Sequence, residues 1–337
     1  MNYFITGGTG FIGTHLTNLL HEVHPEAKIY NLDIIEPGTP LPTVKNYKPA
    51  LRKGEEHAAT FIYCDVRQPI ELEKVNITPD DVIFNFAAVH RTPGHPDPAY
   101  FETNIRGAEN VCAFAERHGI RKIVFTSSIA PYGAAEELKE ETTLPMPNTP
   151  YGISKLVAEK IHQTWQAGGE GRQLTIVRPG VVFGRGENGN FTRLYWGIRG
   201  HKFMYPGRKD TIKACIYVKE LVRFMLYRLE HHDSGVELYN CCYEPAYTIE
   251  HIVESMKRVT NMKVKVPFMP GWLIMTAAGI AGALGSPMGI CPARVRKLQI
   301  STNICGKKLS ASGYRFHYTF EEALADWYKD NGNLYLQ

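Results

Sequence analysis

The stretch MNYFITGGTGFIGTHLTNLL, residues 1–20, places a short apolar run, a glycine-rich turn and a helix pattern in direct succession. In such a turn Gly7 permits the tight bend, Gly10 lets the backbone approach a pyrophosphate, and Gly13 lets the helix lie close to the strand. The amides at the helix N-terminus then face the phosphates. The stretch therefore predicts a dinucleotide-binding unit. Its expected cofactor contacts are Gly7, Gly10, Phe11, Ile12 and Gly13.

A carboxylate follows the next apolar run at the distance that a dinucleotide site requires. Residues 28–32 form a second strand pattern, which ends in Asp33, 20 positions after Gly13. A carboxylate at this place can accept hydrogen bonds from the adenosine ribose hydroxyls, and it would repel a 2′-phosphate. We therefore expect NAD rather than NADP as the cofactor.

More strand patterns follow at the spacing of alternating strands and helices. They are continuously apolar, as expected for parallel strands that helices cover on both faces, and residues 100–117 have a helical pattern. We predict an α/β fold: a Rossmann doubly wound parallel sheet (residues 1–178) with a smaller C-terminal α/β substrate-binding lobe (residues 179–332), interleaved in space. The three further strands are expected at residues 60–64, 82–86 and 122–126.

Composition excludes several classes of function. The chain of 337 residues has 21% charged residues and a net charge of +4, without a dense basic stripe, so nucleic acid is not an expected partner. Its 7 cysteines form no CxxC pairs, and we expect reduced thiols and no metal site. The first residues enter a strand without a secretory leader, so we expect a cytoplasmic protein.

The strongest catalytic pattern lies between residues 126 and 155. Ser128 follows a strand, and Tyr151 and Lys155 stand four apart at the start of a helix that extends to about residue 165. This spacing puts both side chains on one helix face. A lysine ammonium beside a phenol is expected to lower the phenol pKa towards neutrality, which produces a base for a sugar hydroxyl. The Ser128 hydroxyl can hold the same oxygen.

Together these motifs resemble the extended short-chain dehydrogenase/reductases, in particular the NAD-dependent sugar epimerase/dehydratase branch. GGTGFIG, Asp65-Val66, FAA, YFETN, TSSIAPYG and YGISK occur in the family's order and span most of the chain. The resemblance implies that Ser128, Tyr151 and Lys155 are catalytic and that Asp65 and Val66 flank the adenine. It also implies that Lys155 holds the nicotinamide ribose. Ala87, Ala88 and Asn104 complete the expected cofactor contacts.

The second half is expected to hold the sugar. AAVHR, GNFTRL, GHKFMYPG and ARVRKLQISTN resemble epimerases of surface-polysaccharide gene clusters, some of which act on undecaprenyl-diphosphate sugars. Asn190 stands where relatives contact the substrate diphosphate. Lys213 replaces an arginine that typical UDP-hexose epimerases have there, and lysine offers a point charge rather than a planar fork. The expected substrate contacts are His90, Arg91, Ser128, Asn190, Lys213 and Arg294; for His90, a role in the core or in capping a loop stays open.

Residues 267–293 contain neither a charged residue nor a histidine. Four prolines interrupt the stretch, and its longest uninterrupted part, residues 272–284, is too short for the roughly 20 residues that cross a bilayer. Two interpretations stay open. The stretch is either a buried helix of the substrate lobe, or an apolar surface that contacts the membrane peripherally, with the basic residues of 294–297 against anionic headgroups.

The expected reaction is the NAD-dependent 4-epimerisation of a diphosphate-linked hexose or N-acetylhexosamine, carried by a nucleotide or by undecaprenyl diphosphate. NAD would be regenerated in each cycle, and we expect a homodimer. The alternative enzyme is an NAD(P)H-dependent reductase of a 4-keto-6-deoxy sugar nucleotide. A dehydratase is disfavoured because no acidic residue adjoins Ser128. A catalytically silent NAD-sensing or scaffold protein is the alternative of another class, and the intact Ser128, Tyr151 and Lys155 argue against it.

Overall fold

A seven-stranded sheet forms the centre of the molecule. The computed structural model describes residues 1–40, 47–90, 95–133, 135–233, 235–273, 276 and 299–337. The sheet has the strand order β12-β7-β5-β4-β1-β2-β3, and each neighbouring pair is parallel. The order reverses between β1 and β4, where the carboxyl ends of strands leave a crevice for ligands. The strands are β1 (Asn2–Thr6), β2 (Lys28–Asp33), β3 (Thr60–Tyr63), β4 (Val82–Asn85), β5 (Lys122–Thr126), β7 (Gln173–Pro179) and β12 (Val236–Cys241).

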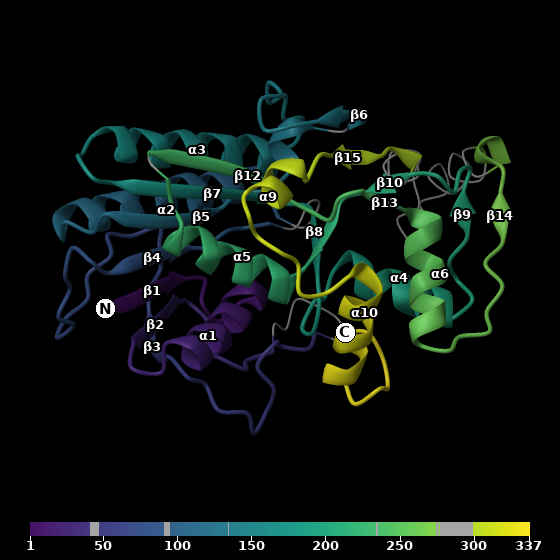
Figure 1. The fold of residues 1–337 in the computed structure, drawn as a ribbon, viewed down its shortest axis with the longest axis horizontal. Coiled ribbons are helices and arrows are strands. Elements are labelled where there is room, and N and C mark those ends of the chain that lie inside the picture. Colours follow the sequence, from purple (N-terminus) through teal and green to yellow (C-terminus); the bar gives the residue numbers. More distant parts are fainter. Residues whose placement is uncertain (41–46, 91–94, 134, 234, 274–275, 277–298) are drawn as a thin grey trace.

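Helices cover both faces of this sheet (Figure 1). Alternate residues of β1 show the two layers: Tyr3 and Ile5 pack with leucines of α1 and α5, whereas Phe4 packs with apolar residues of α2 and α3. Both faces are therefore buried, which explains the continuously apolar strands. The helices are α1 (Phe11–Val23), α2 (Asp97–Arg117), α3 (Pro150–Ala167) and α5 (Val218–Glu230).

The predicted elements of the first half are confirmed, with end shifts of one to three residues. The strand predicted at residues 60–64 ends at Tyr63, and the one at residues 82–86 ends at Asn85. The helix predicted from residue 100 begins earlier, at Asp97, because Pro96 and Pro98 suit a first turn that needs no backbone donors. The fold is the expected Rossmann-type α/β fold.

The second lobe is built from small sheets and helices around an aromatic core. Phe183, Phe191, Tyr217, Phe320 and Trp327 are buried against one another there. Its four-stranded sheet has the order β13-β10-β15-β6, and two further sheets pair β11 with β8 and β14 with β9. The strands are β6 (Ala135–Lys139), β8 (Val181–Phe183), β9 (Tyr205–Pro206), β10 (Ile212–Lys213), β11 (Cys215–Tyr217), β13 (Tyr247–Thr248), β14 (Phe268–Met269) and β15 (Thr302–Ile304). The helices are α4 (Asn190–Arg199), α6 (Ile249–Val259), α9 (Lys307–Ala311) and α10 (Phe320–Asp330).

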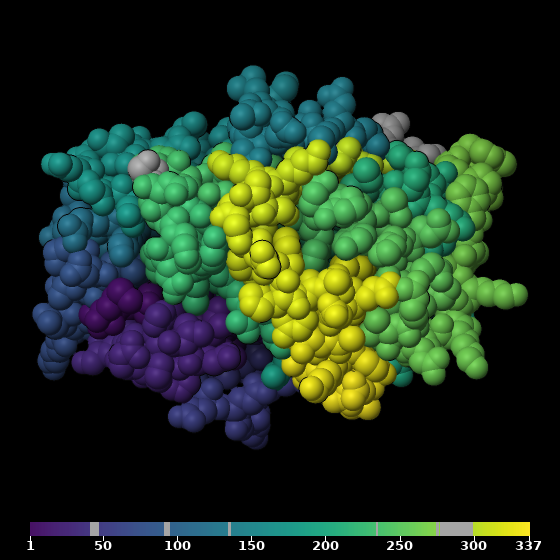
Figure 2. Space-filling model, viewed as in Figure 1, coloured from purple at the N-terminus to yellow at the C-terminus, as the bar shows by residue number. Residues whose placement is uncertain are grey.

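The chain passes between the two lobes several times. β6 comes from the first half but pairs with β15, and β12 comes from the second half but extends the central sheet beside β7. Figure 2 shows the C-terminal segment (yellow) crossing the surface between the lobes. Near its end Leu336 is buried, and the Lys48 ammonium lies 3.7 Å from the centroid of the Tyr335 ring. A division at residues 178 and 179 remains a proposal.

The described cysteines form no disulfides with one another. Among the described residues, six cysteines are free, and all but the half-buried Cys64 are buried. Burial raises the pKa of the Cys112 thiol to about 12.

No helix in the described part of the chain combines the length and apolarity that crossing a bilayer would require. The helix expected at residues 272–284 lies largely outside the described residues.

Candidate active site

The glycine turn between β1 and α1 depends on close contacts between backbone atoms. Gly7 has φ +70°, and a Cβ there would lie 2.8 Å from the backbone nitrogen of Ala87. A Cβ at Gly13 would lie 2.5 Å from the carbonyl oxygen of Gly8. Gly10 is the N-cap of α1 and has no side chain to cover the first-turn amides, where Phe11 and Ile12 stand. This arrangement fits a dinucleotide pyrophosphate.

Asp33 lies beside this turn at the end of β2. Its carboxylate accepts hydrogen bonds from the backbone nitrogens of Thr9 (3.2 Å), Ile34 (2.7 Å) and Ile35 (3.2 Å). The side chain is half-buried, so one edge remains open. The group is therefore fixed next to the turn in the place that suits ribose hydroxyls.

The loop after β3 contributes the predicted adenine neighbours. Asp65 forms a bidentate ion pair with Arg67, with contacts of 2.6 to 3.0 Å, and this pair holds the pKa of the Asp65 carboxyl below its usual range. Val66 is buried against Gly107, where a Cβ would lie 3.0 Å from Cγ2 of Val66. The Val66 carbonyl accepts a hydrogen bond from Asn110, so this loop is tied to α2.

Asn104 links the loop after β4 to the catalytic helix. Its amide oxygen accepts from the Val89 nitrogen at 2.8 Å, and its amide nitrogen donates to the Val89 carbonyl and to the Ser154 hydroxyl at 2.8 Å. Ala87 and Ala88 precede this contact, with Ala87 against Gly7. Asn104 therefore acts as a brace between the cofactor turn and α3.

Ser128, Tyr151 and Lys155 come together at the carboxyl end of β5. α3 begins at Pro150 with Thr149 as its N-cap, whose hydroxyl accepts from the Gly152 nitrogen. Tyr151 is hydrogen-bonded to Ser128, and the Lys155 ammonium donates to the Thr126 carbonyl at 2.7 Å. The structure therefore brings the three predicted residues into one cluster.

The two titratable groups of this cluster are both shifted away from their charged forms. Burial raises the pKa of Tyr151 to about 12, against a smaller lowering by the hydrogen bond to Ser128. Burial also lowers the pKa of Lys155 to about 7, against a smaller raising by Glu159. The expected lowering of the phenol pKa is therefore absent here, because desolvation of the phenolate outweighs the nearby hydrogen bond.

Sequence reasoning missed a buried ion pair below this cluster. Glu159 accepts hydrogen bonds from Ser127 and from the guanidinium of Arg178, and both members of the ion pair are nearly inaccessible. A signal was present: a glutamate four residues after Lys155 falls on the same helix face, which is directed at the sheet.

The predicted substrate residues are less closely grouped. His90 is exposed in the loop after β4, and Arg91 and Arg294 lie outside the described residues. Asn190 opens α4, where its amide oxygen accepts from Arg193 at 2.8 Å. The Lys213 ammonium donates to the Ile300 carbonyl at 2.7 Å. Ala214, which follows it, is buried in the same cluster as Ile129 and Tyr132 of the Ser128 loop.

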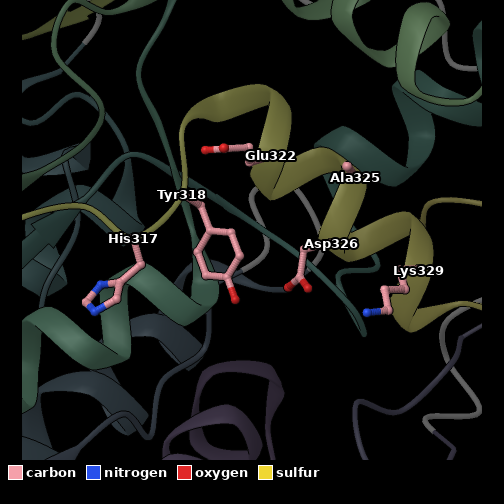
Figure 3. Close-up of a pocket in the computed structure, with 6 residues that line it drawn as sticks. All are labelled: His317, Tyr318, Glu322, Ala325, Asp326 and Lys329. Atoms are coloured by element: carbon pink, nitrogen blue, oxygen red, sulfur yellow. The ribbon is translucent and has the colours of Figure 1, made fainter.

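A separate surface cavity contains none of the predicted site residues. It is lined by His317, Tyr318, Glu322, Ala325, Asp326 and Lys329, along α10 (Figure 3). Asp326 is already engaged there by the Tyr217 hydroxyl and the Lys219 ammonium, each at 2.6 Å. The catalytic interpretation stays with the Ser128 cluster.

The chain matches the sequence model of the NAD dependent epimerase/dehydratase family over residues 3–242. It is 30% identical over 331 residues to the N-acetyl-alpha-D-glucosaminyl-diphospho-ditrans,octacis-undecaprenol 4-epimerase of Escherichia coli O157:H7, covering 96% of this chain and 93% of that one. It is also 30% identical over 302 residues to the UDP-glucose 4-epimerase of Lacticaseibacillus casei, covering 80% and 85%.

Solved structures share the fold. A UDP-N-acetylglucosamine 4-epimerase from Methanobrevibacter ruminantium M1, in complex with UDP-N-acetylmuramic acid, superposes with a TM-score of 0.74 at 21% identity and covers 98% of both chains. A UDP-glucuronic acid 4-epimerase from Bacillus cereus, in complex with NAD, gives 0.73 at 19% identity and covers 99% of this chain and 100% of that one.

Proposed function

Because the chain belongs to the NAD-dependent epimerase/dehydratase family, we propose that it inverts C4 of a hexose or N-acetylhexosamine linked to a diphosphate. The observation that supports this most is the hydrogen bond between Ser128 and Tyr151 beside Lys155. These residues lie at the carboxyl end of β5, which pairs with β4, the strand that neighbours β1 and its glycine turn. This is the place where a sugar and a nicotinamide would meet.

The proposed roles follow from the groups themselves. NAD, when bound, supplies a hydride acceptor and later a hydride donor for the sugar carbon. Tyr151 takes the proton from the 4-hydroxyl oxygen and returns it after the keto sugar has turned over. The Ser128 hydroxyl holds that oxygen, and the Lys155 ammonium provides the positive charge that a phenolate needs in a buried site.

The cofactor side of the proposal rests on Asp33, the glycine turn and the Asp65–Val66 loop. Asp33 is held by three backbone amides, so it is positioned for the two ribose hydroxyls without rearrangement. Gly7, Gly10, Phe11, Ile12 and Gly13 would bind the pyrophosphate, and Ala87, Ala88 and Asn104 would complete the cofactor contacts.

The test is epimerisation without an added reductant. Protein with its co-purified NAD is supplied with a sugar diphosphate, and both C4 epimers are quantified with time. We expect the mixture to reach equilibrium without NADH, and Tyr151→Phe to bind the sugar but not convert it. Consumption of one NADH per product would instead assign the reductase activity.

We further propose that the sugar carrier is a polyprenyl diphosphate and that the protein contacts the membrane peripherally. The support is the lipid-linked substrate in the name of the Escherichia coli relative, together with three exposed apolar side chains near β14. Phe268, Trp272 and Leu273 are 50%, 72% and 41% exposed. Such a patch suits the boundary between headgroups and acyl chains. A homodimer and a substrate role of His90, Arg91, Asn190, Lys213 and Arg294 also remain proposals.

Vesicle sedimentation tests the carrier proposal. Protein is mixed with vesicles of anionic or zwitterionic phospholipid, and bound fractions are compared between wild type and the Phe268→Ser/Trp272→Ser variant. Both replaced side chains are exposed, so the variant should fold and keep its bound NAD. We expect salt-sensitive binding of the wild type to anionic vesicles and a loss of binding in the variant. Wild-type protein that stays in solution and prefers UDP-sugars would contradict the proposal.

A further inference from the structure

A buried carboxylate lies one helical turn beyond Lys155. Glu159 is 1% exposed, and its oxygens accept hydrogen bonds from the Ser127 hydroxyl (2.5 Å) and from Nε (2.8 Å) and Nη2 (2.6 Å) of Arg178. The Arg178 guanidinium also lies 4.7 Å from the centroid of the Tyr132 ring. A fully buried ion pair is costly to form, and it persists only where its hydrogen bonds are well made.

This carboxylate joins three elements directly below the catalytic residues. Ser127 precedes Ser128 at the end of β5, and Arg178 lies on β7, which pairs with β5. On α3, Lys155 donates to the Thr126 carbonyl while Glu159 accepts from the next residue, Ser127. Two side chains of one helix therefore hold Thr126, the last residue of β5, and Ser127, which follows it, and this fixes the spacing between Ser128 and Tyr151 (elements in Figure 1).

The same carboxylate is a negative charge beside the Lys155 ammonium. Burial lowers the pKa of Lys155 to about 7, and Glu159 acts against this shift. In the described part of the chain, Tyr151 lies one turn before Lys155 on α3, His162 is close enough for the charge of Lys155 to act on it, and Arg178 on β7 faces Glu159. Burial lowers the pKa of His162 to about 4, so it is neutral at pH 7, and Arg178 is paired with Glu159. The Phe125 ring on β5 lies 4.8 Å from the ammonium.

We propose that Glu159 is a positioning residue, which holds Ser128 at its distance from Tyr151 and favours the ammonium form of Lys155. Its kinetic consequence rests on the proposed epimerase function. Without the carboxylate, Lys155 loses its proton at a lower pH, and the phenolate of Tyr151 then lacks its counter-charge.

The test compares a variant that removes the charge of Glu159 with a control variant that keeps it. Glu159→Gln keeps the shape and can still accept from Ser127, but it removes the negative charge. Arg178→Lys disturbs the same hydrogen bonds and packing but leaves Glu159 with a positively charged partner. We expect the alkaline limb of the turnover profile to move down by about 1 pH unit in the first variant and to keep its position in the second. A general packing defect would lower turnover in both variants without moving the alkaline limb of Glu159→Gln.

A titration of Lys155 itself needs no sugar. The NAD-loaded protein is labelled with carbon-13 at the lysine ε-carbons, and the Lys155 signal is assigned by its absence from Lys155→Met. We expect its midpoint to fall in Glu159→Gln and to stay at the wild-type value in Arg178→Lys. If either single variant does not fold, Glu159→Gln/Arg178→Met removes the whole ion pair and should still lower the midpoint.

Equal midpoints in wild type and Glu159→Gln would overturn the inference. A displaced midpoint in Glu159→Gln together with no epimerisation by any of the proteins would leave the inference standing and contradict the proposed function. The two failures are therefore distinguishable.

Discussion

Lys155 carries its ammonium group in surroundings that disfavour charge. It is 3% exposed, and its ammonium donates a hydrogen bond to the Thr126 carbonyl. Its pKa is about 7 in the folded protein, against about 10.4 in an unfolded chain. At neutral pH the unfolded chain therefore binds more protons at this residue than the folded protein does. The proposed catalytic role, rather than stability, accounts for a lysine at this place.

Replacing Lys155 with methionine should raise thermal stability. Below pH 7 both states of the wild type carry the proton, so the folded state bears the full cost of burying the charge. Between about pH 7 and 10.4 this cost disappears as the folded state releases its proton. The variant's advantage in Tm is therefore expected to be largest, several degrees, near pH 6 and to shrink towards pH 10. Calorimetry across this range measures it, and a variant less stable at every pH would mean that the bond to Thr126 outweighs desolvation.

Asp33 should decide which dinucleotide binds. Asp33→Asn keeps an acceptor for the backbone amides but removes the charge that repels a 2′-phosphate. We expect its preference for NAD over NADP to narrow by about tenfold, which corresponds to about 1.4 kcal/mol. Asp33→Ala should also weaken NAD itself, since it loses the ribose contacts. Direct titration of the cofactor-depleted proteins gives both constants; a wild type that prefers NADP would refute this role.

At the scale of elements, the unit from β1 to α1 works because helix and strand are almost in contact. A Cβ at Gly13 would meet three backbone atoms of Gly7 and Gly8 within 2.7 Å, and none of these atoms can move alone. Any side chain at residue 13 therefore lifts the N-terminus of α1 away from the turn. The pyrophosphate site and the packing of α1 depend on the same absent methyl group.

Gly13→Ala should therefore lower both stability and NAD affinity. Overpacking of this kind costs about 1–3 kcal/mol, and the displaced amides bind phosphate poorly. Gly197→Ala is a matched control, because a Cβ on α4 would lie 3.4 Å from Phe203, and alanine suits a helix interior better than glycine. Urea titration and the NAD content of the purified proteins report the two effects. Unchanged NAD content in Gly13→Ala would contradict the close-packing account.

Elements that the sequence predicted well are those whose signals are local. The glycine turn fixes its own strand and helix, and the four-residue spacing of Tyr151 and Lys155 places both on α3. Glu159 follows the same spacing, but its importance depends on Arg178 and Ser127, which lie on other elements. That partnership arises from the packing of α3 on the sheet, so no pattern in the sequence around Glu159 predicts it.

At the scale of the molecule, the interleaved lobes explain what the sequence could not predict. β12 extends the central sheet although the substrate lobe's β8, α4 and β11 precede it in the chain. A parallel strand on an outer position has the same apolar pattern as one inside another sheet, so the pattern does not choose between them. β6 raises the same difficulty in reverse, since it leaves the first half to pair with β15. Strand order is set by long-range packing.

The buried cysteines could report an opening between these lobes. Cys215, Cys241, Cys242 and Cys305 lie in or next to the strands that carry the chain between the lobes, whereas Cys112 lies on α2. A buried thiol with a raised pKa reacts with an alkylating reagent only when the surrounding structure opens, so its labelling rate measures the free energy of that opening. Cys64, which is half-buried, and Cys291, which lies outside the described residues, would first be replaced by serine. Mass spectrometry could then follow the alkylation rate of each remaining cysteine separately in one sample. If a sugar diphosphate draws the lobes together, alkylation of the four cysteines between the lobes should slow while the alkylation rate of Cys112 stays the same. The labelling rates of the thiols would therefore report domain closure.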